Sequence, residues 1–450
     1  MVSVRRSFAP PAPDVDAATI FLPAAVGLIA ASLLTPPGAA VGGQANPDSE
    51  QIIPPPERFL SAPDPAQVAL GRSIFNTKWS PASAPSADPP SVDAPAATAL
   101  GSVRREGLGP LFNATSCNTC HNEGAGGRGP TGDGPIPIAL EIQLGSSSED
   151  VDEQASDPVY GRVFSTSAVE SVEAEGMATV HYTEIYGYYY PDGTHWRTRA
   201  PHYRLIGLSR GPLAATTVIK PRLAPPLFGV GLLEAVPGLP GRFGWQANML
   251  SIRDQTTKAL AAEMGLTSPD RPSDDCTPTE TDCQSQHHNE SPEVSEELIE
   301  ALVAFQRTLT VPESPPDTKD SLGFGLFREI GCAVCHKLQI PVELSQADGT
   351  KVRTAIAPYT DLQTHDLGRE MDDETVAGAK VRSRWRTAPL WGLGYRMKTQ
   401  SHPTFLHDGR ARSAEEAILW HSGEAAPTRQ NFVILGPRSR QALLRWLETR

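Results

Sequence analysis

Two stretches of the chain carry cysteine and histidine at the same spacing: residues 117–121 and residues 332–336 both read C-x-x-C-H. Two thiols at this spacing can bond to the vinyl groups on one edge of a porphyrin, and the adjacent histidine can then bind the iron as the proximal ligand. A structural zinc site would need two further cysteine or histidine ligands at close spacing, and neither stretch has them. The sequence therefore predicts two covalently bound haem c groups. The predicted attachment residues are Cys117, Cys120, Cys332 and Cys335, and the predicted proximal ligands are His121 and His336.

Residues 1–45 have the features of an export signal. Arg5 and Arg6 precede an apolar stretch, and small residues near Ala39 offer a cleavage site. The alternative is a retained membrane anchor, which Pro23 within the apolar stretch disfavours. Because haem is attached to C-x-x-C-H outside the bacterial cytoplasm, both features predict a periplasmic protein.

The formal net charge of −13 indicates which classes of molecule the protein is expected to bind. An acidic protein is repelled by phosphate groups, so nucleic acid and anionic membrane surfaces are not expected partners. The same charge suits a basic redox protein. We therefore expect an electron-donor or electron-acceptor protein such as a small cytochrome or a cupredoxin.

The two remaining cysteines, Cys276 and Cys283, lie seven positions apart in a polar, acidic stretch. An exported protein folds in an oxidising compartment, which favours a disulfide that closes a small loop. The alternative is a redox-active pair, but such pairs use the C-x-x-C spacing. The sequence therefore favours a structural disulfide.

The composition divides the rest of the chain into three parts. Residues 46–99 are rich in proline, alanine and serine and are predicted to be a linker, in which residues 65–75 have the spacing of a short helix. Residues 100–312 are predicted to form a first haem c domain, and residues 318–450 a second cytochrome c domain. A polar, proline-containing connector separates the two.

Local patterns predict the elements of these domains. Apolar and polar residues alternate over 136–144 and 178–190, and the turn sequence Y-P-D-G-T follows at residues 190–194. We therefore expect a small β-hairpin insertion in the first domain. Apolar residues at helical spacing predict helices over residues 252–263, over residues 298–309 and after Pro437.

The same two residues precede each C-x-x-C-H. Leu111-Phe112 stands before the first haem site (residues 117–121) and Leu326-Phe327 before the second haem site (residues 332–336), with each phenylalanine five positions before the first cysteine. This internal repeat predicts that each haem site follows a helix whose phenylalanine packs on the porphyrin.

The sixth position of each iron is left open by the spacing alone, and the choice matters because methionine gives a higher reduction potential than histidine. In the second domain the candidates are Met397, His365, His402, His407 and His421. In the first domain no histidine follows His121 closely, which predicts an open or weakly bound distal position. His181, His195 and His202 remain candidate ligands there.

Several longer tracts resemble a known family. They are residues 385–394 (WRTAPLWGLG), 405–411 (FLHDGRA) and 415–421 (EEAILWH), with residues 111–117 (LFNATSC) and 224–235 (APPLFGVGLLEA) in the first domain. Together they resemble the di-haem oxidoreductase family, also labelled thiol-oxidoreductase-like. That family is related to bacterial di-haem cytochrome c peroxidases and to the di-haem enzyme that matures methylamine dehydrogenase. The resemblance covers nearly all of the chain after the linker.

The resemblance implies a sixth ligand for the second haem. In the peroxidases a methionine lies fourteen residues after the histidine of the F-H-D-G tract and ligates that haem. In this chain the position holds His421. The resemblance therefore implies that His336 and His421 both bind the second iron, which departs from the peroxidase pattern and lowers the potential. The alternative is a surface histidine on a helix.

The resemblance also implies catalytic residues. The peroxidases place a tryptophan between the haems, a glutamine ten residues later, and a glutamate further along the same helix over the first haem. Trp245 and Gln255 match that spacing, and Glu263 is the nearest carboxylate, two residues earlier than the pattern. Trp245 would carry an electron between the irons and Glu263 would move a proton during peroxide cleavage. The plainer interpretation is a buried tryptophan, a surface glutamine and a helix-end glutamate.

These observations predict a mainly α fold made of two cytochrome c-type haem domains, the first with a small β insertion. The leading function is a periplasmic di-haem c-type oxidoreductase of peroxidase-like type, in which the second haem relays electrons to a catalytic first haem. The alternative is a non-catalytic di-haem electron-transfer cytochrome. A third hypothesis is the modification of side chains on a partner protein.

Overall fold

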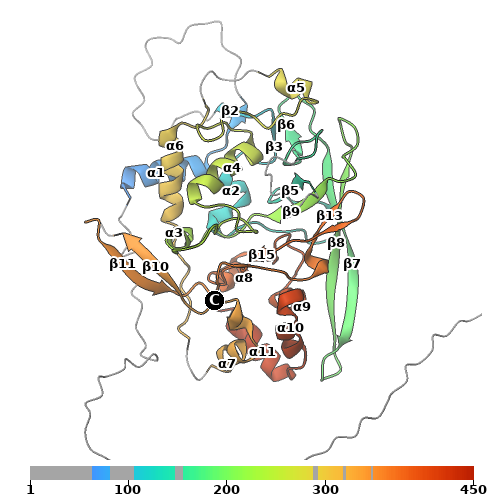
Figure 1. Cartoon of the computed structure of the whole chain (residues 1–450), viewed down its shortest axis with the longest axis vertical. Helices are drawn as coiled ribbons and strands as arrows, with labels where there is room; N and C mark the ends of the chain where they lie inside the picture. The colour runs from blue at the N-terminus through green and yellow to red at the C-terminus, as the bar shows by residue number, and fades with distance from the viewer. Residues whose placement is uncertain (1–62, 82–105, 147–155, 287–291, 318–320, 346–347) are drawn as a thin grey trace, which may run out of the picture. The chain divides into compact units, whose positions relative to one another are not determined.

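The structure is a computed structural model, and Figure 1 labels its elements. It describes residues 63–81, 106–146, 156–286, 292–317, 321–345 and 348–450. The described residues belong to one compact unit. The predicted export signal and most of the predicted linker lie outside the described residues. Within the described ranges, no helix has both the length and the apolar character needed to cross a membrane.

The expectation of a mainly α fold is wrong. Of the described residues 30% are helical and 22% are in strands, so the fold is mixed α/β. The largest contribution comes from the predicted hairpin, where β7 (Met177–Tyr189) and β8 (His195–Ile206) are 13 and 12 residues long. The turn predicted at residues 190–194 joins them, which is confirmed by the antiparallel register from Met177–Ile206 to Tyr189–His195.

A first hydrophobic core gathers helices around the first haem site. α1 (Pro65–Asn76) packs on α6 (Glu296–Arg307), with α4 (Ile252–Met264) and α3 (Val230–Glu234) beside them. The approach of α1 to α6 is close, because a Cβ on Gly71 would lie 1.9 Å from the Ala301 carbonyl oxygen. Part of the stretch predicted as a linker therefore belongs to this core, including Trp79, which is buried.

A four-stranded antiparallel sheet stands next to this core in the order β14-β13-β9-β5. β5 (Leu140–Gly145) and β9 (Val218–Leu223) come from the first half of the chain. β13 (Asp373–Thr375) and β14 (Lys380–Val381) come from the second half. The two halves of the chain thus share one sheet, paired through Ile219 and Glu374.

A second hydrophobic core surrounds the second haem site. It contains α7 (Leu322–Glu329), α9 (Ala414–Leu419), α10 (Ala426–Val433) and α11 (Pro437–Leu447). α7 packs on α11, where Phe327 and Trp446 are 4.7 Å apart between ring centres. Phe327 lies on α7 and 6.4 Å from the His336 ring, so the helix predicted before the second haem site is confirmed, and the packing of Phe327 on a porphyrin stays a prediction.

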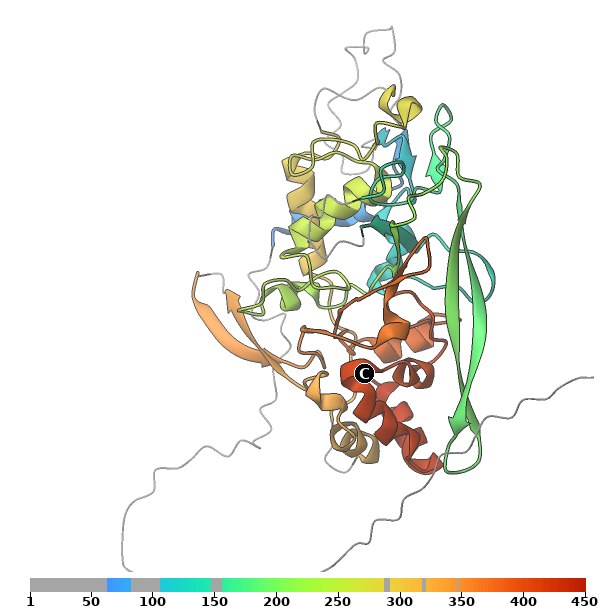
Figure 2. The same ribbon diagram turned by 45° about the vertical axis from the view of Figure 1, so that its right-hand side comes forward.

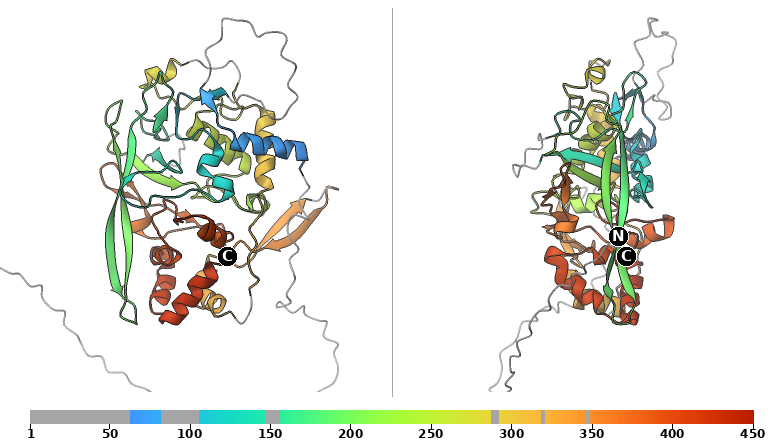
Figure 3. Two further views of the ribbon diagram at one scale, coloured as in Figure 1. Left: turned by 180° about the vertical axis from the view of Figure 1, so that it is seen from behind. Right: turned by 90° about the vertical axis from the view of Figure 1, so that its right-hand side faces the viewer.

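Each half also sends a hairpin into the core of the other half. Figure 2 shows β7–β8 in green beside the red helices α9 to α11. At its tip Tyr190 is buried in the second core and donates a hydrogen bond to Glu415 at 2.7 Å. In return β10 (Ile340–Ser345) and β11 (Lys351–Ile356), orange in Figure 3, pack apolar side chains into the first core.

The remaining elements are short. They are β1 (Ser80–Pro81), β2 (Glu106–Leu108), β3 (Leu111–Phe112), β4 (Gly134–Pro135), β6 (Ser167–Ala168), β12 (Thr364–His365), β15 (Trp385–Arg386), α2 (Cys117–Cys120), α5 (Thr281–Gln284) and α8 (Leu393–Thr399), with single-turn helices η2 (Asn122–Gly124), η3 (Cys332–Val334), η4 (Arg369–Met371) and η5 (Gly423–Ala425). Phe112 lies in β3, so the expectation that each haem site follows a helix is wrong for the first site. The helices predicted over 252–263, 298–309 and after Pro437 are confirmed as α4, α6 and α11.

Candidate haem sites

The first C-x-x-C-H holds its histidine so that one ring nitrogen stays free. Cys117 begins α2, and His121 follows directly after the helix. The His121 ring lies 2.9 Å from the Pro225 carbonyl oxygen through Nδ1. Because a carbonyl only accepts, Nδ1 carries the proton and Nε2 keeps a free lone pair. Burial lowers the pKa of His121 to about 4, against the opposing effect of the Pro225 hydrogen bond, so the ring is neutral at physiological pH.

The second haem site repeats this arrangement with a different partner. His336 donates from Nδ1 to the Tyr359 carbonyl oxygen at 2.9 Å. Burial is the largest cause that lowers its pKa to about 4, and the nearby His421 adds to it. Its Nε2 is therefore also a neutral, available ligand.

The four thiols of both sites are free of disulfides. Burial raises the pKa of Cys117 to about 11 and that of Cys332 to about 12. Burial also raises the pKa of Cys120 to about 12, with a further contribution from Glu141. These thiols therefore stay protonated at neutral pH, unlike the thiolates that zinc or redox exchange requires.

His421 faces His336 across the second site. The two ring centres are 6.4 Å apart, and His421 Nδ1 donates to the Ala417 carbonyl oxygen at 2.8 Å. Two metal–nitrogen bonds of about 2.0 Å, with about 1.1 Å from each nitrogen to its ring centre, would set two axial imidazoles about 6.2 Å apart. A six-coordinate haem iron fits this spacing.

The other candidate ligands of the second iron have different surroundings. His365 bonds to Asp361 at 3.0 Å and to Glu424 at 2.9 Å. His407 stacks on Trp385 at 3.6 Å, and burial moves its pKa well below the usual range. His402 is exposed, and Met397 packs beside Trp385 and Trp420 in a separate cluster.

The candidate histidines for the first iron lie together on the long hairpin. His181 and His202 are paired across β7 and β8, and both are exposed. His181 bonds to Asp133, and His202 lies 3.1 Å from the Thr183 hydroxyl. His195 stacks on Tyr189 at 3.8 Å. In the described ranges, His121 has no facing imidazole comparable to the one that faces His336.

A buried tryptophan cluster connects the surroundings of the two sites. It consists of Met371, Trp385, Phe405, Ala411 and Trp420, with Trp245 packed against it. Trp245 donates to the Leu223 carbonyl oxygen at 2.7 Å, two residues before the proline that holds His121. At the other side Trp420 directly precedes His421 and is buried. The tryptophan predicted to lie between the haems is thus part of a longer aromatic path.

The three predicted catalytic residues are not all together. Gln255 reaches Gly244, the neighbour of Trp245, with its Oε1 3.7 Å from the place that a Cβ on Gly244 would take. Glu263 lies eight residues further along α4, about 12 Å along the helix axis. Its backbone oxygen accepts from Asn113 at 2.8 Å, on the side of the chain that leads into α2.

Glu141 was missed by the sequence reasoning. It lies on the face of β5 opposite to the apolar Ile142 and is close enough to Cys120 to raise the thiol pKa. Burial raises the pKa of Glu141 itself, whereas Gln143 donates a hydrogen bond to it and Lys258 attracts its charge. The alternation of apolar and polar residues over this strand was visible, but it did not indicate that the polar face is turned toward a haem site.

An ion pair that the sequence could not indicate lies on the same sheet. Arg222 of β9 bonds to Asp373 of β13 at 2.7 and 2.8 Å, and both are buried. The Arg222 guanidinium lies 4.8 Å from the centre of the Trp385 ring. The pair therefore fixes the sheet beside the tryptophan cluster.

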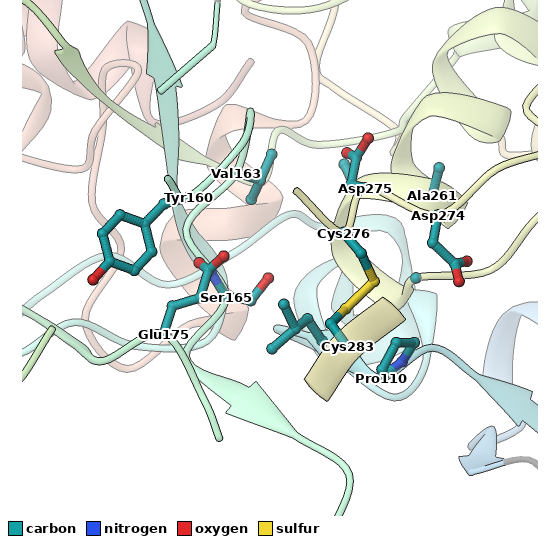
Figure 4. A pocket seen from close by; sticks show the side chains of 13 residues that line it. Pro110, Tyr160, Val163, Ser165, Glu175, Ala261, Asp274, Asp275, Cys276 and Cys283 are labelled. Atoms are coloured by element: carbon teal, nitrogen blue, oxygen red, sulfur yellow. A yellow bond between two sulfur atoms is a disulfide. The ribbon is translucent and has the colours of Figure 1, made fainter. Parts of the chain in front are cut away.

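The cavity drawn in Figure 4 lies elsewhere, beside a disulfide between Cys276 and Cys283. Its volume of about 20 Å³ would hold a single water molecule. Glu175, which lines it, is buried together with Glu280 and Arg210. This cavity is too small for a haem or a substrate.

Residues 234–449 match the sequence model of the family described as "Di-haem oxidoreductase, putative peroxidase". Over these residues, just under half of the chain, the sequence is similar to that family. The matched di-haem oxidoreductase segment includes the second C-x-x-C-H and His421, whereas the first C-x-x-C-H precedes it.

Among solved structures, a chain of hydrazine synthase from Kuenenia stuttgartiensis, pressurized with 20 bar xenon, is similar at 15% identity and a TM-score of 0.29. The similarity covers 51% of this chain and 73% of that one. No curated protein sequence matches the chain.

Proposed function

We propose that the chain is a periplasmic di-haem c-type oxidoreductase with peroxidase-like activity. Residues 117–121 and 332–336 would each bind one haem through two thioether bonds and a proximal histidine. The free, half-buried thiols and the two Nδ1–carbonyl hydrogen bonds support this assignment. Bound haem supplies one-electron chemistry and, where one coordination position is open, cleavage of a peroxide O–O bond.

The observation that carries the proposal is the unequal surroundings of the two histidines. His336 faces His421 at a spacing that fits two axial ligands, and His121 has no such partner among the residues described. We therefore assign electron relay to the second site and substrate chemistry to the first. Trp245 and the tryptophan cluster lie along the chain segments that join the two sites.

Peroxide cleavage needs a group that takes a proton from one oxygen and gives it to the other. Glu263 stays the carboxyl predicted from the resemblance, and Gln255 lies eight residues before it on α4. Glu141 is the second candidate, because it lies close enough to Cys120 to raise the pKa of that thiol and because burial raises the pKa of Glu141 itself. We favour Glu141, because its charge acts on Cys120, one of the proposed attachment residues of the first haem.

The electron partner is proposed from charge. A net charge of −13 suits a basic donor or acceptor, such as a small cytochrome or a cupredoxin. Periplasmic location follows from the predicted export signal in residues 1–45 and from the site of haem attachment.

The spectrum of the purified holoprotein tests the proposal. We expect a low-spin ferric component from the second site and a high-spin or weakly ligated component from the first, and only the latter should react with peroxide. Wholly low-spin haem that is inert to peroxide in every redox state would instead identify a non-catalytic electron carrier.

A further inference from the structure

Seven arginines are buried in the part of the chain that the structure describes. Five of them bond to acidic side chains or to several carbonyl oxygens. Four bond to an acidic side chain: Arg222 to Asp373, Arg410 to Asp408, Arg440 to Asp192 and Arg450 to Asp317. Arg199 instead donates to the carbonyl oxygens of Pro130, Thr131 and Arg410. The last two, Arg386 and Arg396, face no acidic partner in the described ranges, and burial alone lowers the pKa of each to about 10.

Arg396 of α8 is the least satisfied of the seven. A guanidinium has five N–H donors, and the side chain makes one hydrogen bond, from Nη2 to the Thr404 carbonyl oxygen at 3.2 Å. Its Nε is buried and has no partner among the described residues. The group remains charged at neutral pH, and a buried charge needs a counter-ion.

One turn further along the chain, Gln400 ties α8 to the first haem site. Its Nε2 donates to the carbonyl oxygens of Ala125 and Gly126 at 3.4 and 3.3 Å, shortly after His121. Its buried Oε1 also lacks a hydrogen-bond partner within the described structure. Arg396 Nε and Gln400 Oε1, four positions apart at the end of α8, are thus two buried polar atoms without a partner among the described residues, and a polar ligand beside α8 could satisfy them.

Two further contacts place Arg396 at the same site. Thr404, whose carbonyl oxygen accepts from Arg396, also accepts at Oγ1 from the Gly129 backbone N–H at 2.8 Å. Tyr395, the neighbour of Arg396, packs edge-on against Phe228 at 5.5 Å, close to the proline that holds His121. The loop that leaves the first C-x-x-C-H is thus held by residues 395–404 of the second half.

We propose that Arg396 binds a propionate of the first haem, with Gln400 as a positioning residue, so that the second half of the chain completes the first haem site. The proposal rests on haem being bound at the first site and does not depend on peroxidase activity. A haem carries two carboxylates, and the planar fork of arginine matches a carboxylate through two parallel hydrogen bonds. A free organic acid offers the same chemistry, and the experiment separates the two sources.

The test is a redox titration of the desalted holoprotein at several pH values, followed by optical and electron paramagnetic resonance signals that resolve the two haems. In Arg396→Gln the ferrous-to-ferric ratio of the first haem at a fixed potential should fall about tenfold, which is about 59 mV for one electron. The pH at which that potential changes should also rise, because the propionate loses the cation that keeps it ionised and its pKa increases.

Matched variants separate charge from structure. Arg396→Lys keeps a charge without the fork, so it should retain most of the potential and the pH profile. Arg440→Gln removes an equally buried arginine whose partner is Asp192, and it should leave the first haem unchanged. If Arg396→Gln does not fold, the Lys variant still decides, because a propionate vibrational band of the first haem should shift in its resonance Raman spectrum.

Three results would overturn the proposal: an unchanged first haem in Arg396→Gln with an unchanged propionate band in Arg396→Lys, a shift confined to the second haem, or a wild-type potential that changes when acetate is added and reverts on desalting. The last result would identify a free carboxylate as the ligand. Lack of peroxide turnover with the expected response to Arg396→Gln would reject the proposed function and keep this inference.

Discussion

The two C-x-x-C-H sites hold their histidines in the same way and differ in what surrounds them. Both proximal histidines donate from Nδ1 to a backbone carbonyl oxygen at 2.9 Å. The second site is built from its own half of the chain, with Phe327, Tyr359 and His421 around His336. The first site is closed by residues of the other half, such as Thr404, which is 275 positions from its partner Gly129.

The difference shows that the attachment motif does not determine the chemistry of a haem site. The motif fixes one axial ligand and the covalent anchor. Whether the opposite position is filled depends on which element the fold brings to face the histidine. At the second site that element is the end of α9, which presents His421, and at the first site the described structure presents no imidazole.

The largest expected effect comes from removing the histidine that makes the sites unequal. His421→Gly should convert the second haem from a low-spin to a high-spin ferric spectrum and should leave the spectrum of the first haem unchanged. Optical and electron paramagnetic resonance spectra of the holoprotein provide the measurement. His402→Gly, at an exposed histidine in the same half, is the control. An unchanged second haem in His421→Gly would show that another residue is the ligand.

The next effect concerns the chemistry assigned to the first site alone. We expect Glu141→Gln to slow the reaction with peroxide about 100-fold, since general acid–base groups contribute on that scale. Glu263→Gln should change the rate by less than about threefold if its role is structural. Stopped-flow rates with both variants decide between the two carboxyls. The reverse order would restore Glu263 as the acid–base group.

The buried carboxyl group of Glu175, in the first half of the chain, should make the stability of the fold depend on pH. Burial and the neighbouring Glu280 raise the pKa of Glu175 well above its usual value, despite the Ser165 N–H. A group with a raised pKa in the folded state stabilises the fold at low pH, and the contribution is lost as pH rises above about 4.5, by at most about 1.4 kcal/mol per pH unit.

Glu175→Gln mimics the protonated carboxyl and should therefore flatten this dependence. Hydrogen exchange in residues 274–285, measured from pH 4 to 8, reports this dependence. Wild type and variant should be equally protected from exchange near pH 4. Near pH 8 the variant should be better protected. Equal protection of both proteins across the whole range would contradict the expected role of Glu175.

The smallest effect tests whether the first half stabilises the second. Tyr190 donates to Glu415 at 2.7 Å, and the Arg440 guanidinium lies 3.6 Å from its ring centre. Tyr190→Phe removes the hydrogen bond and should lower the unfolding free energy of the second core by about 1 kcal/mol. Chemical denaturation followed at the second haem provides the value, with the exposed Tyr186→Phe as the control.

Short sequence patterns predicted the local turns and helix ends that they encode. The turn at residues 190–194 and the helical spacing before Gly265 each depend on a few neighbouring residues. The structure has the turn between β7 and β8 and ends α4 at Gly265 in a left-handed conformation. Such features need no knowledge of the rest of the fold.

Features formed between distant residues could not be predicted in the same way. The mainly α expectation took β7 and β8 as a small insertion, because alternation reveals a strand but not its partner or its docking surface. The pairing of Arg222 with Asp373 joins residues 151 positions apart. The burial of Glu141 beside Cys120 likewise depends on where β5 lies, which no short pattern contains.

The shared sheet has a consequence for how the molecule is assembled. Residues 117–121 and strands β5 and β9 lie far along the chain from β13 and from residues 400–409, which they contact in the finished fold. Contacts at such separations form late, since a long loop must first be closed. Until then the first C-x-x-C-H lacks the residues that cover it in the finished fold. Late closure would thus leave an interval in which the proposed first haem could be joined to an accessible segment before the second half covers it.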